Sequence, residues 1–177
     1  MEPLLNGVPL HPRLGQFAGD CTNLTSPPPA KVTALLSKKT KYAINALVFI
    51  ARHEDEQPIP VSRIAEERNI PLKFLESILV ELKNARIVRS KKGKYGGYYL
   101  NGHPEDIDLA QIVRLFDGAI ALLPCVTHNY YEPCEECMDE ETCGIRQVAL
   151  EIRNATVARL KDATLASILA RERDMRE

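Results

Sequence analysis

A chain of 177 residues, of which 45% are apolar and 27% charged, can bury one core of ordinary size. It contains no apolar run of the roughly 18 residues that would cross a bilayer. It also lacks a positive N-terminal region followed by an apolar stretch, so we expect a cytoplasmic protein with no membrane partner. In that compartment, clustered cysteines indicate metal or redox chemistry rather than structural disulfides.

The formal net charge of −1 is distributed unevenly along the chain. Between Lys38 and Lys94, thirteen basic residues stand against seven acidic ones, and the stretch from Lys83 to Lys94 has no acidic residue. Six carboxylates then follow between Glu132 and Glu141. A basic region beside an acidic one predicts an anionic partner that docks on one side, although either run alone could be an ordinary solvated surface.

The first predicted segment in chain order is a disordered N-terminal arm, residues 1–35. It is rich in proline and glycine and shows no apolar period, so it cannot bury enough surface to offset the entropy of ordering. Cys21 in this arm is interpreted as an incidental thiol.

Three helices are expected next. Ser37 is a plausible N-cap for a first helix that ends near His53, because apolar residues recur there at helical spacing. A short helix is expected over 63–68, and a third over 72–85, with Pro71 suited to its first position. The third helix is expected to bury Leu75, Ile78, Leu79 and Leu82. Two helices joined by so short a turn predict a helix-turn-helix.

The apolar period then changes to that of strands. Residues 87–90 and 98–100 are predicted to pair as a hairpin, and glycines in the link permit the positive dihedral angles that a tight turn requires. A hairpin directly after a helix-turn-helix is a wing. Asp108 and Gln111 form a capping-box-like start for a helix to about Phe116.

The remaining chain divides into a cysteine-bearing loop and a helical end. The loop covers 119–144. Ile145 and the apolar residues after it mark a long amphipathic helix, and Thr164 is suited to cap a short terminal one. The sequence thus predicts a mainly α protein with a small β-hairpin wing: a winged helix-turn-helix domain over 36–118, the cysteine loop, and a long helix with a tail over 145–177.

A winged helix-turn-helix predicts DNA binding, with the second helix of the motif in the major groove and the wing on the phosphates. The candidates on the groove helix are Lys73, Phe74, Glu76 and Ser77, and those on the wing are Arg89, Lys91, Lys92 and Lys94. Glu76 could accept a hydrogen bond from a cytosine amino group. The alternative is a winged helix that binds another protein.

The second candidate site is a group of four cysteines, Cys125, Cys134, Cys137 and Cys143, with the spacing C-x8-C-x2-C-x5-C. Four thiols within 19 residues are an unusual use of cysteine for packing. Zinc sites usually pair two short C-x2-C knuckles, and only one is present. The spacing alone favours an iron–sulfur centre and a zinc site about equally, and it favours a thiol–disulfide switch less than either.

Catalytic motifs are absent from the sequence. It has no phosphate-binding glycine loop before a helix and no Ser-His-Asp arrangement. A dithiol oxidoreductase built on Cys134 and Cys137 is disfavoured, because the flanking carboxylates would raise the thiol pKa values. We therefore expect a protein that is not an enzyme.

Several motifs together resemble the Rrf2 family of bacterial winged-helix transcription regulators. They are the run from Leu36 to Ala43, the segments Ile64-Ala65-Glu66, Ile70-Pro71, Phe74-Leu75 and Ile78-Leu79, Leu82, and above all Val88-Arg89-Ser90 followed by Gly93 and Gly96-Gly97-Tyr98. The resemblance covers roughly 36–169. It implies a homodimer in which the long C-terminal helices pair and each subunit reads half of a palindromic operator in double-stranded DNA.

The resemblance also assigns roles to individual residues. It puts Glu76 where cluster-sensing members carry a base-discriminating glutamate, and Lys92 where they place a minor-groove arginine. A narrow minor groove usually favours arginine, so the sequence preference is expected to differ here.

For the cysteine loop, the resemblance implies an iron–sulfur cluster, [2Fe-2S] or [4Fe-4S], that reports iron–sulfur, redox or nitric oxide status. The chain departs from the family spacing C-x5-C-x5-C. Arg146 and Lys41 occupy positions where different members supply a fourth ligand, and neither can ligate a metal. Cys125 is therefore the expected fourth ligand, with His128 as the substitute and zinc as the alternative metal.

Overall fold

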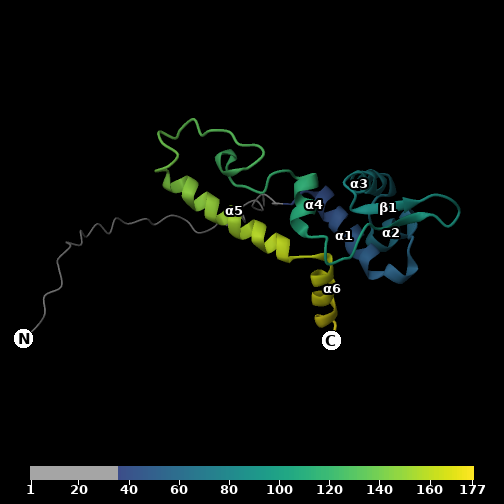
Figure 1. Cartoon of the computed structure of the whole chain (residues 1–177). Helices are drawn as coiled ribbons and strands as arrows, with labels where there is room; N and C mark the ends of the chain where they lie inside the picture. Colours follow the sequence, from purple (N-terminus) through teal and green to yellow (C-terminus); the bar gives the residue numbers. More distant parts are fainter. Residues whose placement is uncertain (1–35) are drawn as a thin grey trace, which may run out of the picture. The chain divides into compact units, whose positions relative to one another are not determined.

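The computed structural model describes residues 36–177, and the predicted arm with Cys21 lies outside them. These residues form one compact unit that is mainly helical and carries a single two-stranded hairpin (Figure 1). The elements are α1 (Lys38–Arg52), η1 (Glu54–Glu56), α2 (Val61–Arg68), α3 (Leu72–Asn84), β1 (Val88–Lys91), β2 (Gly97–Leu100), α4 (Leu109–Phe116), η2 (Pro124–Val126), α5 (Gly144–Asp162) and α6 (Leu165–Asp174). No helix in this part of the chain is long and apolar enough to span a membrane.

Helix α1 is the centre of the fold. It packs against α2, α3, α4, α6 and β2, and Figure 1 shows it surrounded by these elements. Ala43, Leu47 and Ile50 are fully buried along it. The helix begins as predicted, because the Ser37 side chain accepts a hydrogen bond from the backbone N–H of Thr40 and so satisfies one of the unpaired N–H groups of its first turn.

The helix-turn-helix consists of α2 and α3. Asn69 makes the sharp turn between them in the left-handed conformation, with φ of 50°, which asparagine tolerates better than most residues. Pro71 lies at the N-cap of α3, one position before the predicted one. The four apolar residues predicted to be buried on this helix are all inaccessible to solvent, and they fix which face of α3 is left exposed: Leu75, Ile78, Leu79 and Leu82.

The wing is anchored to the rest of the domain through its second strand. β1 and β2 pair antiparallel from Val88 opposite Leu100 to Lys91 opposite Gly97. Tyr98 also exchanges two backbone hydrogen bonds with Ile59, of 2.8 and 2.9 Å, in the connection before α2. At the base of the wing, backbone hydrogen bonds therefore join three segments: β1, β2 and the connection before α2.

The wing glycines serve two purposes, of which the sequence indicated only one. Gly93 has the positive φ, 113°, that a turn requires. Gly96 and Gly97 are needed instead for close backbone approach. A Cβ on Gly97 would collide with the carbonyl of Ile59, and one on Gly96 with the carbonyl of Lys91.

The C-terminal helices return to the core. Asp108 caps α4 by accepting from the backbone N–H of Gln111, and Thr164 caps α6 by accepting from that of Ser167, both as predicted. Leu165 is fully buried in the main core. Helix α6 thus packs on α1, where Glu172 pairs with Arg52, and α5 contacts α4.

Replacing Gly97 by alanine is expected to destabilise the protein by about 1–3 kcal/mol, because the added methyl group must displace the Ile59 backbone. The measurement is urea denaturation followed by circular dichroism. Gly144→Ala is the matched control, since a Cβ there meets no neighbouring atom within 4 Å. Equal midpoints for the two variants would contradict the close-approach argument.

Candidate nucleic-acid interface and cysteine loop

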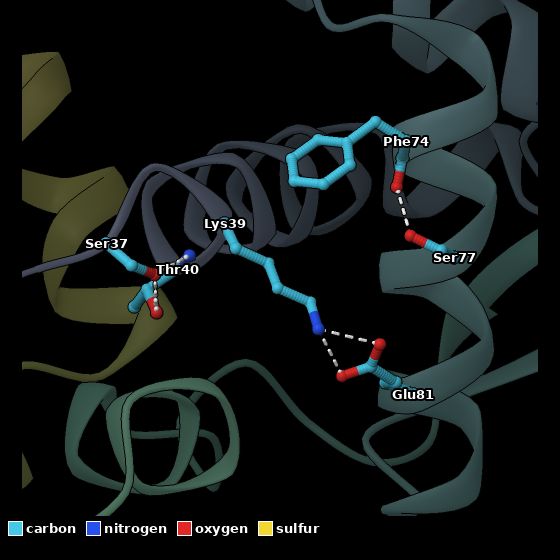
Figure 2. A network of polar contacts seen from close by, with 6 residues as sticks. All are labelled: Ser37, Lys39, Thr40, Phe74, Ser77 and Glu81. Carbon is cyan, nitrogen blue, oxygen red and sulfur yellow. Dashed lines mark hydrogen bonds and ion pairs between the residues drawn. The ribbon is translucent and has the colours of Figure 1, made fainter.

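The exposed face of α3 carries the four predicted groove residues, but they are not equivalent. Phe74 is 37% exposed and its ring meets that of Tyr42 on α1 edge-on, with centroids 5.7 Å apart. The Ser77 hydroxyl donates to the Phe74 carbonyl at 2.8 Å (Figure 2). Lys73 and Glu76 are exposed and form no hydrogen bond or ion pair with another side chain in the described part of the chain. Phe74 and Ser77 therefore already have intramolecular partners, whereas Lys73 and Glu76 remain available to a ligand.

An ion pair that sequence reasoning did not identify also joins α3 to α1. Lys39 Nζ on α1 lies 2.7 and 2.8 Å from the two carboxylate oxygens of Glu81 (Figure 2). The same ammonium group lies 5.2 Å from the centroid of the Phe116 ring on α4. One lysine on α1 thus contacts both α3 and α4. In the sequence, the only indication of this role was a basic residue in the first turn of α1.

The start of α1 is also tied to the end of α4. The backbone N–H of Ser37 donates to Asp117 at 3.1 Å. Burial acts to raise the pKa of Asp117, but hydrogen bonds from Ser37 and Thr40 outweigh it, so the carboxyl pKa lies below its usual value. The carboxylate is therefore ionised at neutral pH and holds this corner of the domain together.

The wing presents its basic residues to solvent. Val88 and Leu100 point into the core, while Arg89, Lys91, Lys92 and Lys94 are all exposed. Sequence reasoning missed Tyr95, which is 80% exposed at the tip, with Lys94 Nζ 5.7 Å from its ring centroid. The only indication of Tyr95 in the sequence was an aromatic residue inside a polar turn.

The cysteine loop lies beside α5 and ends at its first turn (Figure 1). Cys125 is 4% exposed in η2 and forms a small buried cluster with Val126 and Ala149, against which Cys134 packs. Cys137 follows Cys134 in a tight turn, with a backbone hydrogen bond of 3.3 Å between them. Cys143 is the N-cap of α5. The four sulfurs thus belong to one local structure, and none of them forms a disulfide.

The thiols differ in their acidity. The backbone N–H of Arg146 and a hydrogen bond from Cys137 lower the pKa of Cys143, as expected for a thiol at a helix N-terminus. The same hydrogen bond raises the pKa of Cys137, and a hydrogen bond to Glu136 raises the pKa of Cys134. The expectation that acidic neighbours disfavour thiolates thus describes Cys134 and not Cys143.

The four thiols of the loop do not form a metal coordination sphere in this arrangement. Within residues 36–177, no group of three or more His, Cys, Asp or Glu side chains converges closely enough to hold a metal ion. The chemistry of the donor set nevertheless fits an iron–sulfur cluster or zinc, since both are held by cysteine thiolates. His128 is engaged elsewhere, with its Nε2 3.2 Å from Arg153.

One ion pair and a hydrogen bond to a backbone carbonyl attach the loop to α5. Glu140 lies 3.5 Å from the Arg146 guanidinium and also accepts a hydrogen bond from the Tyr131 hydroxyl, which raises the pKa of Tyr131. On the other side, Arg153 donates to the carbonyl of Val126 at 2.5 Å. The loop is therefore tethered to the first three turns of α5.

A helix-turn-helix that continues directly into a basic two-stranded wing defines the winged-helix class of DNA-binding proteins. Comparison with known proteins specifies the class further. The model of the Rrf2 family, described as iron-dependent transcriptional regulators, matches residues 36–171. The chain belongs to the Rrf2 family, and it is a DNA-binding transcriptional regulator, not an enzyme.

Individual relatives agree with this assignment. An rrf2-like HTH-type transcriptional regulator of Rhodobacter capsulatus is 37% identical over 139 residues, which cover 77% of this chain and 93% of the relative. The HTH-type transcriptional regulator IscR of Aliivibrio salmonicida is 32% identical over 90 residues, about half of each chain. The solved structure of CymR, the global cysteine regulator of Bacillus subtilis, superposes with a TM-score of 0.64 at 27% identity, covering 77% of this chain and 97% of that one.

Proposed function

We propose that this chain acts as a homodimer that binds a palindromic operator and senses iron–sulfur, redox or nitric oxide status through a cluster held by its cysteine loop. The observation that carries the sensor part is the position of the four thiols: they flank and cap the N-terminal end of α5, the helix expected to pair between subunits. The family description as iron-dependent regulators supports it.

The DNA contacts follow from exposure and charge. In this proposal, α3 enters the major groove with Lys73 and Glu76 facing the bases, and Phe74 and Ser77 set the shape of the helix surface at its start. The wing cations contribute mainly sequence-independent attraction to phosphates: Arg89, Lys91, Lys92 and Lys94. Tyr95 lies among them at the tip.

The dimer contact follows from an apolar stripe on α5. Ile145, Val148 and Ile152 are 75%, 55% and 45% exposed, and their spacing of three and four residues places them on one face of the helix. The adjoining face, with Ala149, packs against the cysteine loop. Three large apolar side chains exposed in a row on a surface helix mark an association surface, and a second copy of α5 matches it in length and spacing.

The cysteine loop transmits its state through its own attachments to α5. Cys143 and Cys125 hold the loop to the first turns of the helix, and Cys134 and Cys137 form the intervening turn. All four residues, Cys125, Cys134, Cys137 and Cys143, are the proposed ligands. A bound cluster would supply redox- and nitric-oxide-sensitive chemistry at this junction. The order of the loop then determines how α5 holds the DNA-binding domain.

Two alternatives use the same residues. Zinc would hold the thiolates without redox chemistry. A thiol switch is favoured by one specific observation: Cys143 accepts a hydrogen bond from the backbone N–H of Arg146 at 3.4 Å in the first turn of α5, which lowers the pKa of this thiol. Metal analysis and the response of DNA affinity to a thiol oxidant distinguish the cluster, the zinc site and the thiol switch.

Lys92→Ala and Glu76→Ala are expected to impair DNA binding in different ways. Loss of a phosphate contact should weaken binding to all sequences and reduce the slope of log affinity against log salt by about 1. Loss of a base contact should leave nonspecific affinity nearly unchanged but relax the preference at one operator position, worth about 1–3 kcal/mol.

The measurement for both is fluorescence anisotropy over a salt series, with a duplex that the wild-type protein selects from a random pool and single-base variants of it. Each variant serves as the control for the other. An unchanged salt slope for Lys92→Ala, or equal losses on all duplexes for Glu76→Ala, would reject the corresponding contact.

Ile152→Glu is expected to convert the dimer to a monomer at micromolar concentration, because it places a charge in the centre of the apolar stripe. Sedimentation velocity measures the change. Gln147→Glu adds the same charge to an exposed site elsewhere on α5 and should leave the dimer intact. A dimer that persists in Ile152→Glu would exclude this stripe as the interface.

Protein purified without oxygen is expected to contain iron and acid-labile sulfide and to absorb visible light, and Cys137→Ala should lose most of both. Cys21→Ala is the matched control, since Cys21 lies outside the loop. Colourless protein with stoichiometric zinc would favour the zinc alternative. Metal-free protein whose DNA affinity responds to a thiol oxidant would favour the thiol switch.

A further inference from the structure

A cavity of about 480 Å³ lies between α4, the segment 118–130 and the C-terminal half of α5. Its lining contains three cationic side chains, Arg114, Arg153 and Lys161, together with His128, and no carboxylate from the described residues. This concentration of cations stands out in a chain with a net charge of −1. A concave site lined by one sign of charge focuses the electrostatic field and attracts ligands of the opposite sign.

The charges of this cavity are not neutralised within the domain. None of the ion pairs formed among residues 36–177 involves the three cavity cations Arg114, Arg153 or Lys161. Those pairs join Lys39 to Glu81, Arg52 to Glu172, Arg63 to Glu56 and Arg146 to Glu140. An anionic ligand would therefore find cations without having to displace a carboxylate.

Arg153 is held in place by neutral acceptors only. Its guanidinium donates to the carbonyl of Val126 at 2.5 Å and to the side-chain oxygen of Asn154 at 2.7 Å. It also donates to His128 Nε2 at 3.2 Å. Because arginine cannot accept, Nε2 must be the acceptor, which leaves the imidazole proton on Nδ1, where it remains a donor for a ligand. These hydrogen bonds fix the direction of the cation without cancelling its charge.

A second observation at the same cavity points to a missing partner. The Thr127 hydroxyl oxygen is buried and has no hydrogen-bond partner among the described residues, and Thr127 lines the cavity. An unsatisfied buried polar group costs about 1–3 kcal/mol, so such groups are usually paired with a ligand or water in the functional state.

We propose that this cavity binds a small anion carrying two or more carboxylate or phosphate groups, and that its binding changes the affinity for DNA. Several separate cations around one cavity favour a ligand with more than one anionic group, and the volume is in the range of small-molecule sites. Arg114 belongs to α4 of the DNA-binding domain, whereas Arg153 and Lys161 belong to α5. One bound polyanion therefore bridges the two and favours one relative position of these helices.

The first test is calorimetric titration of the full-length protein at constant ionic strength with citrate, pyrophosphate and acetate. We expect citrate or pyrophosphate to bind and monovalent acetate not to bind, and the tighter of the two identifies the ligand group as carboxylate or phosphate. The double variant Arg114→Gln/Lys161→Gln should bind at least tenfold more weakly. Both residues are exposed, so the fold should persist, and Arg171→Gln on α6 is the control for loss of a surface cation.

The second test measures DNA affinity with and without the bound anion. The anion should change the affinity of the wild type and of Arg171→Gln by at least about fivefold and that of the double variant little. The proposal is overturned if neither polyanion binds at millimolar concentration, if the double variant binds as tightly as wild type, or if all proteins lose DNA affinity equally. Operator binding and iron content without the anion are measured separately, so failure here is distinguishable from failure of the sensor proposal.

Discussion

The burial of one helix determines the rest of this structure. Helix α1 is enclosed by four other helices and a wing strand, and its small residues Ala43 and Ala46 let those neighbours approach closely. Because the groove helix α3, the wing strand β2 and α4 each pack directly on α1, they keep fixed relative positions. The Lys39–Glu81 pair strengthens one of these contacts at the surface; as a partly exposed pair it contributes only about 0.2–1 kcal/mol, so burial dominates.

The cysteine loop and the cationic cavity share one mechanical element, α5. Cys143 begins this helix, Arg153 attaches its middle to the carbonyl of Val126, and Lys161 lies near its end. The thiols lie at the N-terminal end of α5, and the cavity lies where the C-terminal half of α5 meets α4. Because α5 is attached at both ends, it can combine two signals. Each signal biases the same relative position of α5 and the winged helix-turn-helix domain.

Much of the fold could be predicted because it is encoded locally. Three of the caps, Ser37, Asp108 and Thr164, were identified from residue type and act as expected, since a capping side chain reaches only two or three residues along its own chain. The apolar period of α3 likewise gave its buried face. The positions of the candidate groove residues on that helix followed, but the contact of Phe74 with Tyr42 did not, because Tyr42 is distant in sequence.

By itself, the sequence determined the order of the main helices and the hairpin, the charge of the wing and the grouping of four cysteines in one loop, because these depend on residue type and short-range spacing. Only the tertiary structure decided that Gly97 is required by the backbone of Ile59, that α6 closes onto α1, and that Arg114, Arg153 and Lys161 converge on one cavity. The physical reason is that close approach and charge convergence depend on side chains far apart in the chain. Packing around α1, not local propensity, brings them together.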